Sequence, residues 1–281
     1  MGWVVSNSNA IPNLFVIGAM KCGTTTLHDY LSLHPGIGMS NPKEVNWCAG
    51  ENSARSLDWY LSHFDSRCSV RGESSQNYTK RHVPVYSGAA TRMAALSPGA
   101  RLIYIVRDPI ERYRSHIAEN FVGESSEWLS WNRENDHYFK TGLYHWQLEP
   151  FLIHYSIDRL LVVELEELAA NPLGVMNEVF DFLGVDRISD RSVFDFVSNQ
   201  NGEEVVPVRV RRHIAYRALK RLVPGLTGTA VSHTVIRRIF FRGSYKPELG
   251  VDETDRLREA YADDIAALRS LTGKSFSRWS V

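Results

Sequence analysis

The chain has 281 residues, of which 43% are hydrophobic and 23% charged, and its 32 Lys and Arg balance its 32 Asp and Glu. That length allows a sizeable core, and a net charge of zero argues against a protein that coats nucleic acid. No apolar run approaches the ~18 residues of a membrane span, and residues 1–13 lack a basic stretch followed by an apolar one, so we expect no signal peptide.

The three cysteines are Cys22, Cys48 and Cys68. They form neither a CxxC pair nor a Cys/His spacing typical of zinc sites. A small, odd number of cysteines fits free thiols in a reducing compartment. We therefore expect a cytoplasmic protein.

Strand-like and helix-like segments alternate along the chain. Short apolar runs predict buried strands at residues 14–17, 70–73, 102–106 and 160–163. Helical spacing predicts helices at residues 24–33, 109–119, 172–183 and 253–271, with Asp108 as an N-cap before Pro109. This order predicts an α/β fold with a central parallel sheet flanked by helices. No linker is evident, so we expect a single domain, 1–281, with insertions at about 121–147 and 201–246.

The first strand runs into a glycine turn, Gly18 to Gly23, which opens a helix at Thr24. Backbone N–H groups and the positive end of a helix dipole make such a turn an anion site. The match to a Walker A loop is partial, because Thr24 stands where that motif has lysine and Lys21 lies inside the turn. A glycine turn with an incidental lysine is the alternative. We favour a phosphate-binding turn, with hydroxyl donors from Thr24, Thr25 and Thr26, in a P-loop-like three-layer fold.

A second candidate anion site begins at Arg107, directly after the strand at 102–106. Ligands of open α/β sheets bind at the carboxyl ends of strands, and arginine supplies forked, charge-assisted donors for phosphate. Arg107 and Ser115 could therefore hold a separate phosphate. The alternative is a helix start with surface ion pairs, which suits Glu111, Arg112 and Arg114 better than Arg107.

Together the two segments resemble the 5′-phosphosulfate loop and the 3′-phosphate motif of sulfotransferases that use 3′-phosphoadenosine 5′-phosphosulfate (PAPS), in particular the bacterial and heparan-sulfate-type branch. Residues 15–25 are similar to that branch's opening signature, and residues 42–44 and 57–60 to its next block. Tyr144 lies in a similar Gly-x-Tyr segment, and residues 183–185 and 271–279 also fit the family.

The resemblance implies roles for individual residues. It assigns the 5′-phosphosulfate to Lys21, Cys22, Gly23, Thr24, Thr25 and Thr26, the 3′-phosphate to Arg107 and Ser115, and a further donor contact to Tyr144. Glu44 matches the family's general base. Two departures affect donor contacts. The family often has a Lys-Ser pair after the strand near Glu73, where this chain reads Glu73-Ser74-Ser75-Gln76. Residues 242–247 depart from the family's Gly-Arg segment, so Arg242 or Lys246 is expected to substitute.

These assignments imply in-line transfer of a sulfuryl group to an acceptor hydroxyl or amine, leaving 3′-phosphoadenosine 5′-phosphate (PAP). Lys21 would stabilise the leaving phosphate and Glu44 would take the acceptor proton. Glu44 could instead be a surface carboxylate paired with Lys43, and the rival bases are His28, His82 and His116. No metal is expected. The alternatives are a P-loop kinase or NTPase and a catalytically inactive nucleotide-binding scaffold.

The acceptor is not indicated by the sequence, and a small molecule, a glycan and a lipid all remain open. Aromatic residues in 121–147 could line an acceptor pocket or simply pack locally. Residues 207–242 contain nine Lys or Arg and no Asp or Glu, so this segment could attract an anionic acceptor, PAPS or a membrane surface, or form a solvated helix face. We expect no nucleic-acid partner, and peripheral membrane contact and the oligomeric state stay open.

Overall fold

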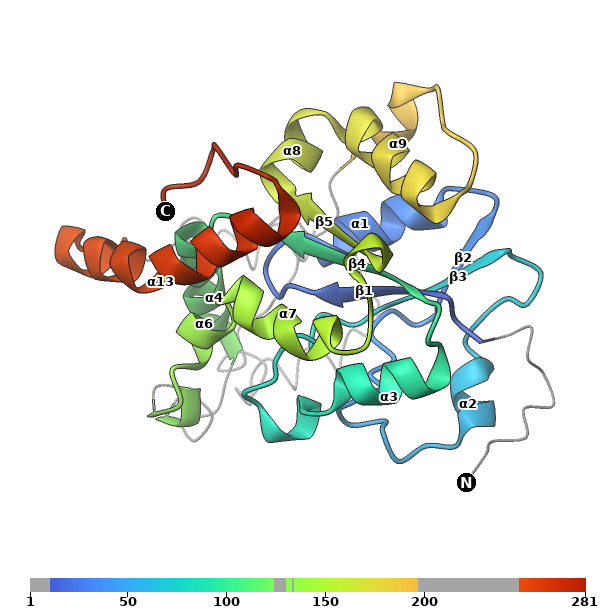
Figure 1. The fold of residues 1–281 in the computed structure, drawn as a ribbon, viewed down its shortest axis with the longest axis horizontal. Helices are drawn as coiled ribbons and strands as arrows, with labels where there is room; N and C mark the ends of the chain where they lie inside the picture. The colour runs from blue at the N-terminus through green and yellow to red at the C-terminus, as the bar shows by residue number, and fades with distance from the viewer. Residues whose placement is uncertain (1–10, 124–129, 133, 197–247) are drawn as a thin grey trace, which may run out of the picture.

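Five parallel strands form the centre of the protein (Figure 1). The computed structural model describes residues 11–123, 130–132, 134–196 and 248–281. The strands, in chain order, are β1 Leu14–Gly18, β2 Ile37–Met39, β3 Val70–Ser74, β4 Arg101–Val106 and β5 Leu160–Glu164. Their order across the sheet is β2-β3-β1-β4-β5, and each neighbouring pair is parallel. The predicted α/β fold with a central parallel sheet is therefore confirmed.

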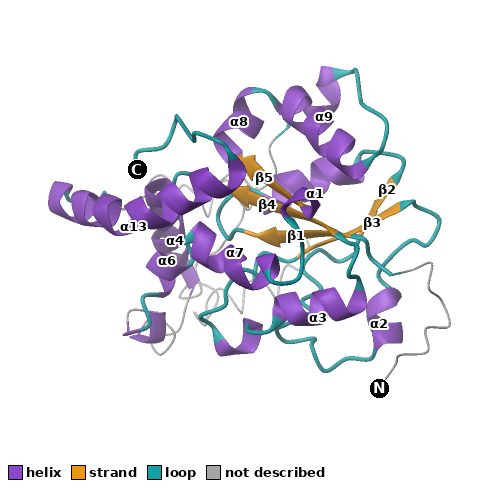
Figure 2. Cartoon of the chain, viewed as in Figure 1, coloured by secondary structure: helices purple, strands orange, loops and turns teal. Residues whose placement is uncertain are grey.

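Helices cover both faces of this sheet (Figures 1 and 2). In Figure 1, α1, α8 and α9 lie on one side of the strands and α2, α3 and α7 on the other. The long C-terminal helix α13 packs against α4 and α7. The α-helices described are α1 Thr24–Ser32, α2 Leu57–Leu61, α3 Ala89–Leu96, α4 Pro109–Gly123, α6 His137–Lys140, α7 Tyr144–Leu152, α8 Leu165–Ala170, α9 Pro172–Leu183 and α13 Val251–Thr272. Short 3₁₀ turns lie at Pro84–Tyr86, Ile157–Arg159 and Arg191–Phe194.

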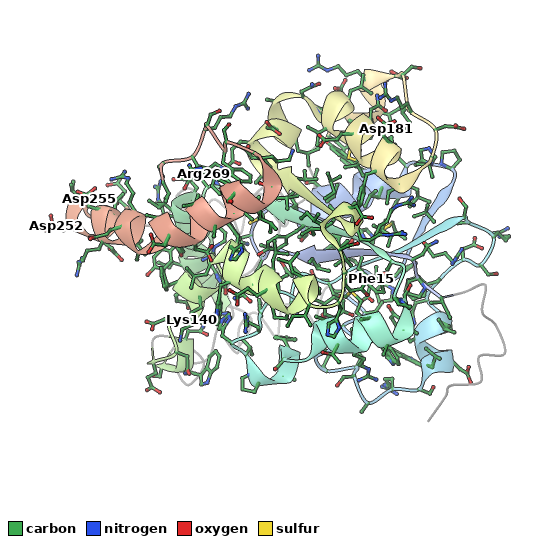
Figure 3. The ribbon with its side chains drawn as sticks, in the orientation of Figure 1. Phe15, Lys140, Asp181, Asp252, Asp255 and Arg269 are labelled. Carbon is green, nitrogen blue, oxygen red and sulfur yellow. The ribbon has the colours of Figure 1, made fainter. Side chains whose placement is uncertain are left out.

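Strand β1 lies in the middle of the sheet, and its side chains are apolar on both faces. Leu14, Phe15, Val16 and Ile17 are all fully buried, as expected for a strand with helices above and below it. In Figure 3, Phe15 lies in the interior, whereas Asp181 on α9 lies near the edge of the molecule. Phe15 pairs with Glu73 on β3 and with Leu102 on β4. The carboxyl ends of β3, β1 and β4 therefore meet at one edge of the sheet.

Capping interactions are present at the helix ends that the sequence predicts for α9 and α4. At α9, the Asn171 side chain accepts a hydrogen bond from the Gly174 N–H, Pro172 follows it, and Gly184 ends the helix at φ 67°. Asp108 caps α4, as expected, by accepting from the N–H groups of Ile110 and Glu111. Strand β2 and helices α2, α3, α6, α7 and α8 were not among the predicted elements.

The connections place β1 at a point where the chain changes direction across the sheet. From β1 the chain runs through α1 to β2 and β3 on one side, and from β3 it passes through α3 to β4 on the other side of β1. Ligands of open α/β sheets bind in the crevice outside the carboxyl ends of strands at such a point. A ligand-binding site is therefore expected at the turns that follow β1 and β4.

Two expectations concern parts of the chain that the structure describes incompletely. The first insertion, 121–147, contains α6 and the start of α7, whereas 201–246 lies outside the described residues, as does the basic segment 207–242. The single domain stays a prediction. Within the residues that are described, every helix is too short or too polar to cross a bilayer.

Replacing Gly18 with alanine should destabilise the fold. A Cβ at this position would lie 2.1 Å from the Thr79 Oγ1 and 3.1 Å from the Tyr104 ring. Overpacking of this kind typically costs about 1–3 kcal/mol of unfolding free energy. Urea unfolding followed by circular dichroism measures the loss. Gly99→Ala is the matched control, because a Cβ added at Gly99 would meet no heavy atom within 4 Å; equal stability of the two variants would contradict the packing argument.

Candidate functional site

The turn from Gly18 to Gly23 is tied to the sheet on both sides. The Ala19 N–H donates to the Ile105 carbonyl at 2.7 Å, and the Thr79 N–H donates to the Ile17 carbonyl at 3.2 Å. Lys21 has φ 69° and Gly23 has φ 87°. A non-glycine residue in this left-handed region costs about 1–3 kcal/mol and persists where the surroundings enforce it, often at functional sites. The turn therefore holds Lys21 in one backbone conformation at the end of β1.

Gly23 occupies the N-cap position of α1 and has no side chain with which to cap the helix. The first N–H groups of α1 therefore face the turn without a side-chain acceptor from the cap residue. Lys21 and Thr25 are half-buried, whereas the side chains of Thr24 and Thr26 are buried and Cys22 is completely enclosed. Among the three threonines, Thr25 is thus the one whose hydroxyl a ligand can reach most directly.

The turn after β4 presents Arg107 and then enters α4. Arg107 Nη2 lies 3.4 Å from Glu111 Oε2, and Arg114 Nη1 lies 2.5 Å from Glu111 Oε1. Glu111 therefore links two arginines, and its carboxylate is about one third exposed. Ser115 lies one turn beyond Glu111, and its side chain is buried. Arg107 thus takes part in the ion pairs of the helix start, and the predicted 3′-phosphate site at Arg107 and Ser115 stays a prediction.

The Tyr144 side chain connects the Gly18–Gly23 turn to the turn that begins at Arg107. This fully buried residue donates a hydrogen bond from its hydroxyl to the Arg107 carbonyl at 2.7 Å. The same oxygen lies 3.4 Å from the Arg107 N–H nitrogen and 3.4 Å from the Cys22 Sγ. Burial raises the pKa of the Cys22 thiol to about 11, so this group is a neutral thiol. Tyr144 and Cys22 are thus buried residues that connect the turn of Lys21 to the turn of Arg107.

The C-terminal residues pack over the Arg107–Asp108 turn. The Ser280 N–H donates to Asp108 Oδ2 at 2.5 Å, and the Trp279 Nε1–H donates to Glu166 Oε2 at 3.3 Å. Glu166 Oε1 in turn accepts from the Asp108 N–H at 3.1 Å. The Trp279 ring lies 5.7 Å from the Tyr144 ring. The segment around Trp279, which fits the family ending, therefore supports the end of β4.

Glu44 lies beside the carboxyl end of β3. Its N–H donates to the Ser74 carbonyl at 3.0 Å, its φ is 63°, and its side chain is 28% exposed. Lys43 Nζ lies 2.6 Å from Glu44 Oε1, so the ion pair considered for these two residues is present. Burial and then Lys43 lower the pKa of His28 on α1 to about 4, while Glu44 opposes that change. Glu44 and His28 on α1 both bond to Ser74, Glu44 to its carbonyl and His28 to its hydroxyl, so Glu44 lies near the helix that the Gly18–Gly23 turn opens.

The three candidate histidines are already engaged by other side chains. His28 Nδ1 lies 3.0 Å from the Ser74 Oγ. The Gln147 amide donates to His82 Nδ1 at 3.0 Å, and His82 Nε2 lies 2.9 Å from His137 Nδ1. Arg112 donates to His116 Nδ1 at 3.1 Å. Burial, the largest cause, lowers the pKa of His82 to about 4.

Glu73 was not predicted as a functional residue, because the sequence marked residues 73–76 only as a departure from a family pattern. Glu73 is fully buried at the end of β3 and accepts several hydrogen bonds. The run of polar residues directly after a buried strand was the available signal. Arg242 and Lys246 lie outside the described residues. Among the residues that are described, no three His, Cys, Asp or Glu side chains are grouped to hold a metal ion.

Comparisons with known proteins identify the family to which the chain is similar. The sulfotransferase domain family model matches residues 12–267. A bifunctional heparan sulfate N-deacetylase/N-sulfotransferase of Drosophila melanogaster is 31% identical over 218 residues, covering 66% of this chain and 21% of that protein. The heparan sulfate glucosamine 3-O-sulfotransferase 3B1 of Mus musculus is 28% identical over 202 residues, covering 68% of this chain and 50% of that protein.

A solved structure shows the same fold. The sulfotransferase of Alicyclobacillus acidocaldarius superposes with a TM-score of 0.63 at 24% identity, covering 96% of this chain and 99% of that one. The chain spans about a fifth of the length of the bifunctional relatives and half that of the 3-O-sulfotransferase. The family model covers the candidate turns after β1 and β4 as well as Glu44. The chain belongs to the family of PAPS-dependent sulfotransferases.

Proposed function

We propose that this protein transfers a sulfuryl group from PAPS to a hydroxyl or amine of an acceptor. The observation that supports this most is the pairing of two cationic turns at the neighbouring ends of β1 and β4, joined by the Tyr144 hydroxyl. PAPS carries phosphate groups at both the 5′ and the 3′ position of its ribose. The turn that carries Lys21 would bind the 5′-phosphosulfate, and the turn that carries Arg107 would bind the 3′-phosphate.

On the donor side, the Gly18–Gly23 turn receives the 5′-phosphosulfate through its N–H groups, Lys21 and Thr25. Arg107 and Ser115 receive the 3′-phosphate. Arg107 is already paired with a carboxylate, since Glu111 lies within 3.4 Å of its guanidinium. A phosphate is a better forked acceptor for arginine than this long contact. Donor binding would therefore replace part of the Arg107–Glu111 pair.

The chemistry assigned to the chain's own residues is positioning and charge stabilisation. The acceptor oxygen or nitrogen attacks sulfur, the bond from sulfur to the bridging phosphate oxygen breaks, and PAP leaves with the electron pair. Lys21 stabilises the negative charge that develops on that oxygen, a contribution typically worth about 3–4 kcal/mol for one preorganised donor. Glu44 takes the proton from the acceptor, as its partly exposed carboxylate allows.

Glu44 is a better base than His82 and His116, because one ring nitrogen of each of these histidines already accepts a hydrogen bond and the other carries the proton of the neutral ring. The Gln147 amide oxygen accepts from the Arg81 N–H at 3.0 Å, and its nitrogen donates to the Lys140 carbonyl at 2.7 Å. This fixes the amide orientation, so Gln147 must donate to His82 Nδ1. The proton of neutral His82 then lies on Nε2, toward His137. His116 is buried and accepts from Arg112.

A metal-dependent P-loop kinase or NTPase is the second candidate, and two carboxylates count against it. Such enzymes use an acidic residue near a strand end to hold magnesium. Asp108, directly after Arg107, already accepts from the N–H groups of Ile110, Glu111 and Ser280. Glu73 on β3 is likewise saturated by donors. Both carboxylates are committed to the protein's own backbone and hydroxyl groups.

For the acceptor, we propose a glycan before a small molecule or a lipid. The relatives are named for heparan sulfate, a glycan that is modified on nitrogen by one and on oxygen by the other. A cytoplasmic location and peripheral membrane contact also stay proposals from the sequence.

PAP should bind tightly in a buffer that contains EDTA and no magnesium. The two turns supply the cationic and N–H donors, so a metal is not needed to neutralise the phosphates. Isothermal titration calorimetry measures the dissociation constant. Adenosine 5′-phosphate, which lacks the 3′-phosphate, is the matched control and should bind at least about tenfold more weakly, since one charge-assisted hydrogen bond is worth about 1.5–3 kcal/mol. A preference for Mg-ATP over PAP would contradict the proposal.

Glu44→Gln should lower kcat by about 10²–10⁴-fold, because the amide cannot accept the acceptor proton. The affinity for PAP should stay within twofold. Transfer of radiolabelled sulfate from PAPS to a panel of glycans measures turnover. Asp181→Asn is the control, since it breaks another carboxylate ion pair, with Arg187, on the exposed surface of α9 (Figure 3). Full turnover in Glu44→Gln would remove Glu44 from the mechanism.

Tyr144→Phe should weaken PAP binding by about three- to tenfold and lower the unfolding free energy by about 1 kcal/mol. The variant loses the hydroxyl that links Arg107 to Cys22, and a typical hydrogen bond contributes about that much. Tyr155→Phe is the control, because its buried hydroxyl donates to the Ser97 carbonyl away from both turns. It should lose similar stability and keep PAP affinity. Equal PAP affinity in the two variants would contradict a linking role for Tyr144.

A further inference from the structure

Glu73 is a fully buried carboxylate that the proposed reaction does not use. Its Oε1 accepts from the Asn46 N–H at 3.1 Å, the Ser75 hydroxyl at 2.5 Å and the Tyr78 hydroxyl at 2.6 Å. Its Oε2 accepts from the Tyr60 hydroxyl. A buried carboxylate is costly unless it is hydrogen-bonded. The four donors identify this carboxylate as the hub of a polar network at the end of β3.

The groups that donate hydrogen bonds to Glu73 include Asn46, which lies two residues after Glu44, and two tyrosines that contact Trp47 and Cys48. Asn46 donates from its backbone directly. Tyr78 also accepts from the Cys48 N–H at 3.1 Å, and the Tyr60 ring stacks on Trp47 with centroids 4.6 Å apart. Glu73 therefore contacts, directly or through one tyrosine, each residue from Asn46 to Cys48.

The backbone of residues 44–46 adopts a conformation that contacts from other parts of the fold must stabilise. Glu44 has φ 63° and Asn46 has φ 52°, both in the left-handed region. For a residue such as Glu44 this region costs roughly 1–2 kcal/mol, whereas asparagine adopts it more readily. The Glu44 N–H is bonded to the carbonyl of Ser74, the residue that follows Glu73. Glu73 and its neighbour thus hold the backbone on both sides of residue 45.

We propose that Glu73 is a positioning residue that acts through Glu44: its hydrogen-bonded side chain fixes residues 46–48, and with them the place of the Glu44 carboxylate relative to the acceptor. This inference rests on the proposed role of Glu44 as the base. Burial raises the pKa of Glu73, and the hydrogen bonds from Ser75, Tyr60, Tyr78 and Asn46 oppose that rise.

Glu73→Gln tests the proposal with little change in shape. The amide has only one acceptor oxygen, so at least one of the donors must turn away or accept instead. The Glu44 segment then loosens, and a shift on the order of 1 Å at a catalytic group can cost about 10²-fold in rate. We expect kcat to fall by about 10- to 100-fold, with the affinity for PAP within twofold of the parent protein.

A double-mutant cycle separates positioning from general damage. If Glu73 acts through Glu44, Glu73→Gln should lower kcat in the parent protein and have no further effect in the Glu44→Gln background. Equal fold-losses in both backgrounds would overturn the proposal, and so would a parent-like kcat in Glu73→Gln. If Glu44→Gln alone keeps full turnover, the role of Glu44 itself is wrong, which is a different result.

Tyr60→Phe keeps the test valid if Glu73→Gln does not fold. It removes a single donor to Oε2 and leaves the aromatic stacking on Trp47 in place. We expect a smaller loss of kcat, about three- to tenfold, that again disappears in the Glu44→Gln background. Tyr155→Phe, whose hydroxyl bonds lie elsewhere, should leave kcat unchanged. A loss of kcat in Tyr60→Phe that persists without Glu44 would overturn the positioning role.

Discussion

The parallel pairing of β1 with β3 on one side and β4 on the other is the constraint on which the rest of the structure depends. Parallel strands end at a common edge, so three turns from distant parts of the sequence meet there. The Ala19 N–H bonds to the Ile105 carbonyl and the Ser75 N–H to the Val16 carbonyl, which carries the sheet pairing into the turns themselves. Lys21 and Arg107 follow the neighbouring strands β1 and β4, and the Glu44 N–H bonds to the Ser74 carbonyl at the end of β3, although the three residues are separated along the chain.

Buried polar side chains then fix these turns relative to one another. Tyr144 joins the turns of Lys21 and Arg107, Asp108 joins α4 to the C-terminal segment, and Glu73 joins β3 to the residues after Glu44. Each group makes hydrogen bonds to more than one segment, so removing one of them leaves other buried polar atoms without a partner. Buried networks of this kind favour a single arrangement of the turns, and the proposed reaction needs such preorganised donors.

The sequence predicts those parts of the protein whose signal is local. Apolar runs such as Leu14–Ile17 mark buried strands, Asn171, Pro172 and Gly184 mark the ends of α9, and the glycines around Lys21 mark the turn. Strand β2 was not predicted because it has only three residues, Ile37–Met39, and gains its order from pairing with β3. The Glu73 network could not be predicted either, since its donors Asn46, Tyr60 and Tyr78 come together only through the tertiary fold. The burial of Thr24 and Thr26 likewise depends on how α1 packs on the sheet.

A crystal structure of the complex with PAP tests the central claim most directly, namely that one nucleotide spans the turns after β1 and β4. We expect the 5′-phosphate against the Gly18–Gly23 turn with Lys21 in contact, and the 3′-phosphate on Arg107 and Ser115. Electron density showing PAP bound with its 3′-phosphate away from Arg107, or with both phosphates on one turn, would contradict this claim.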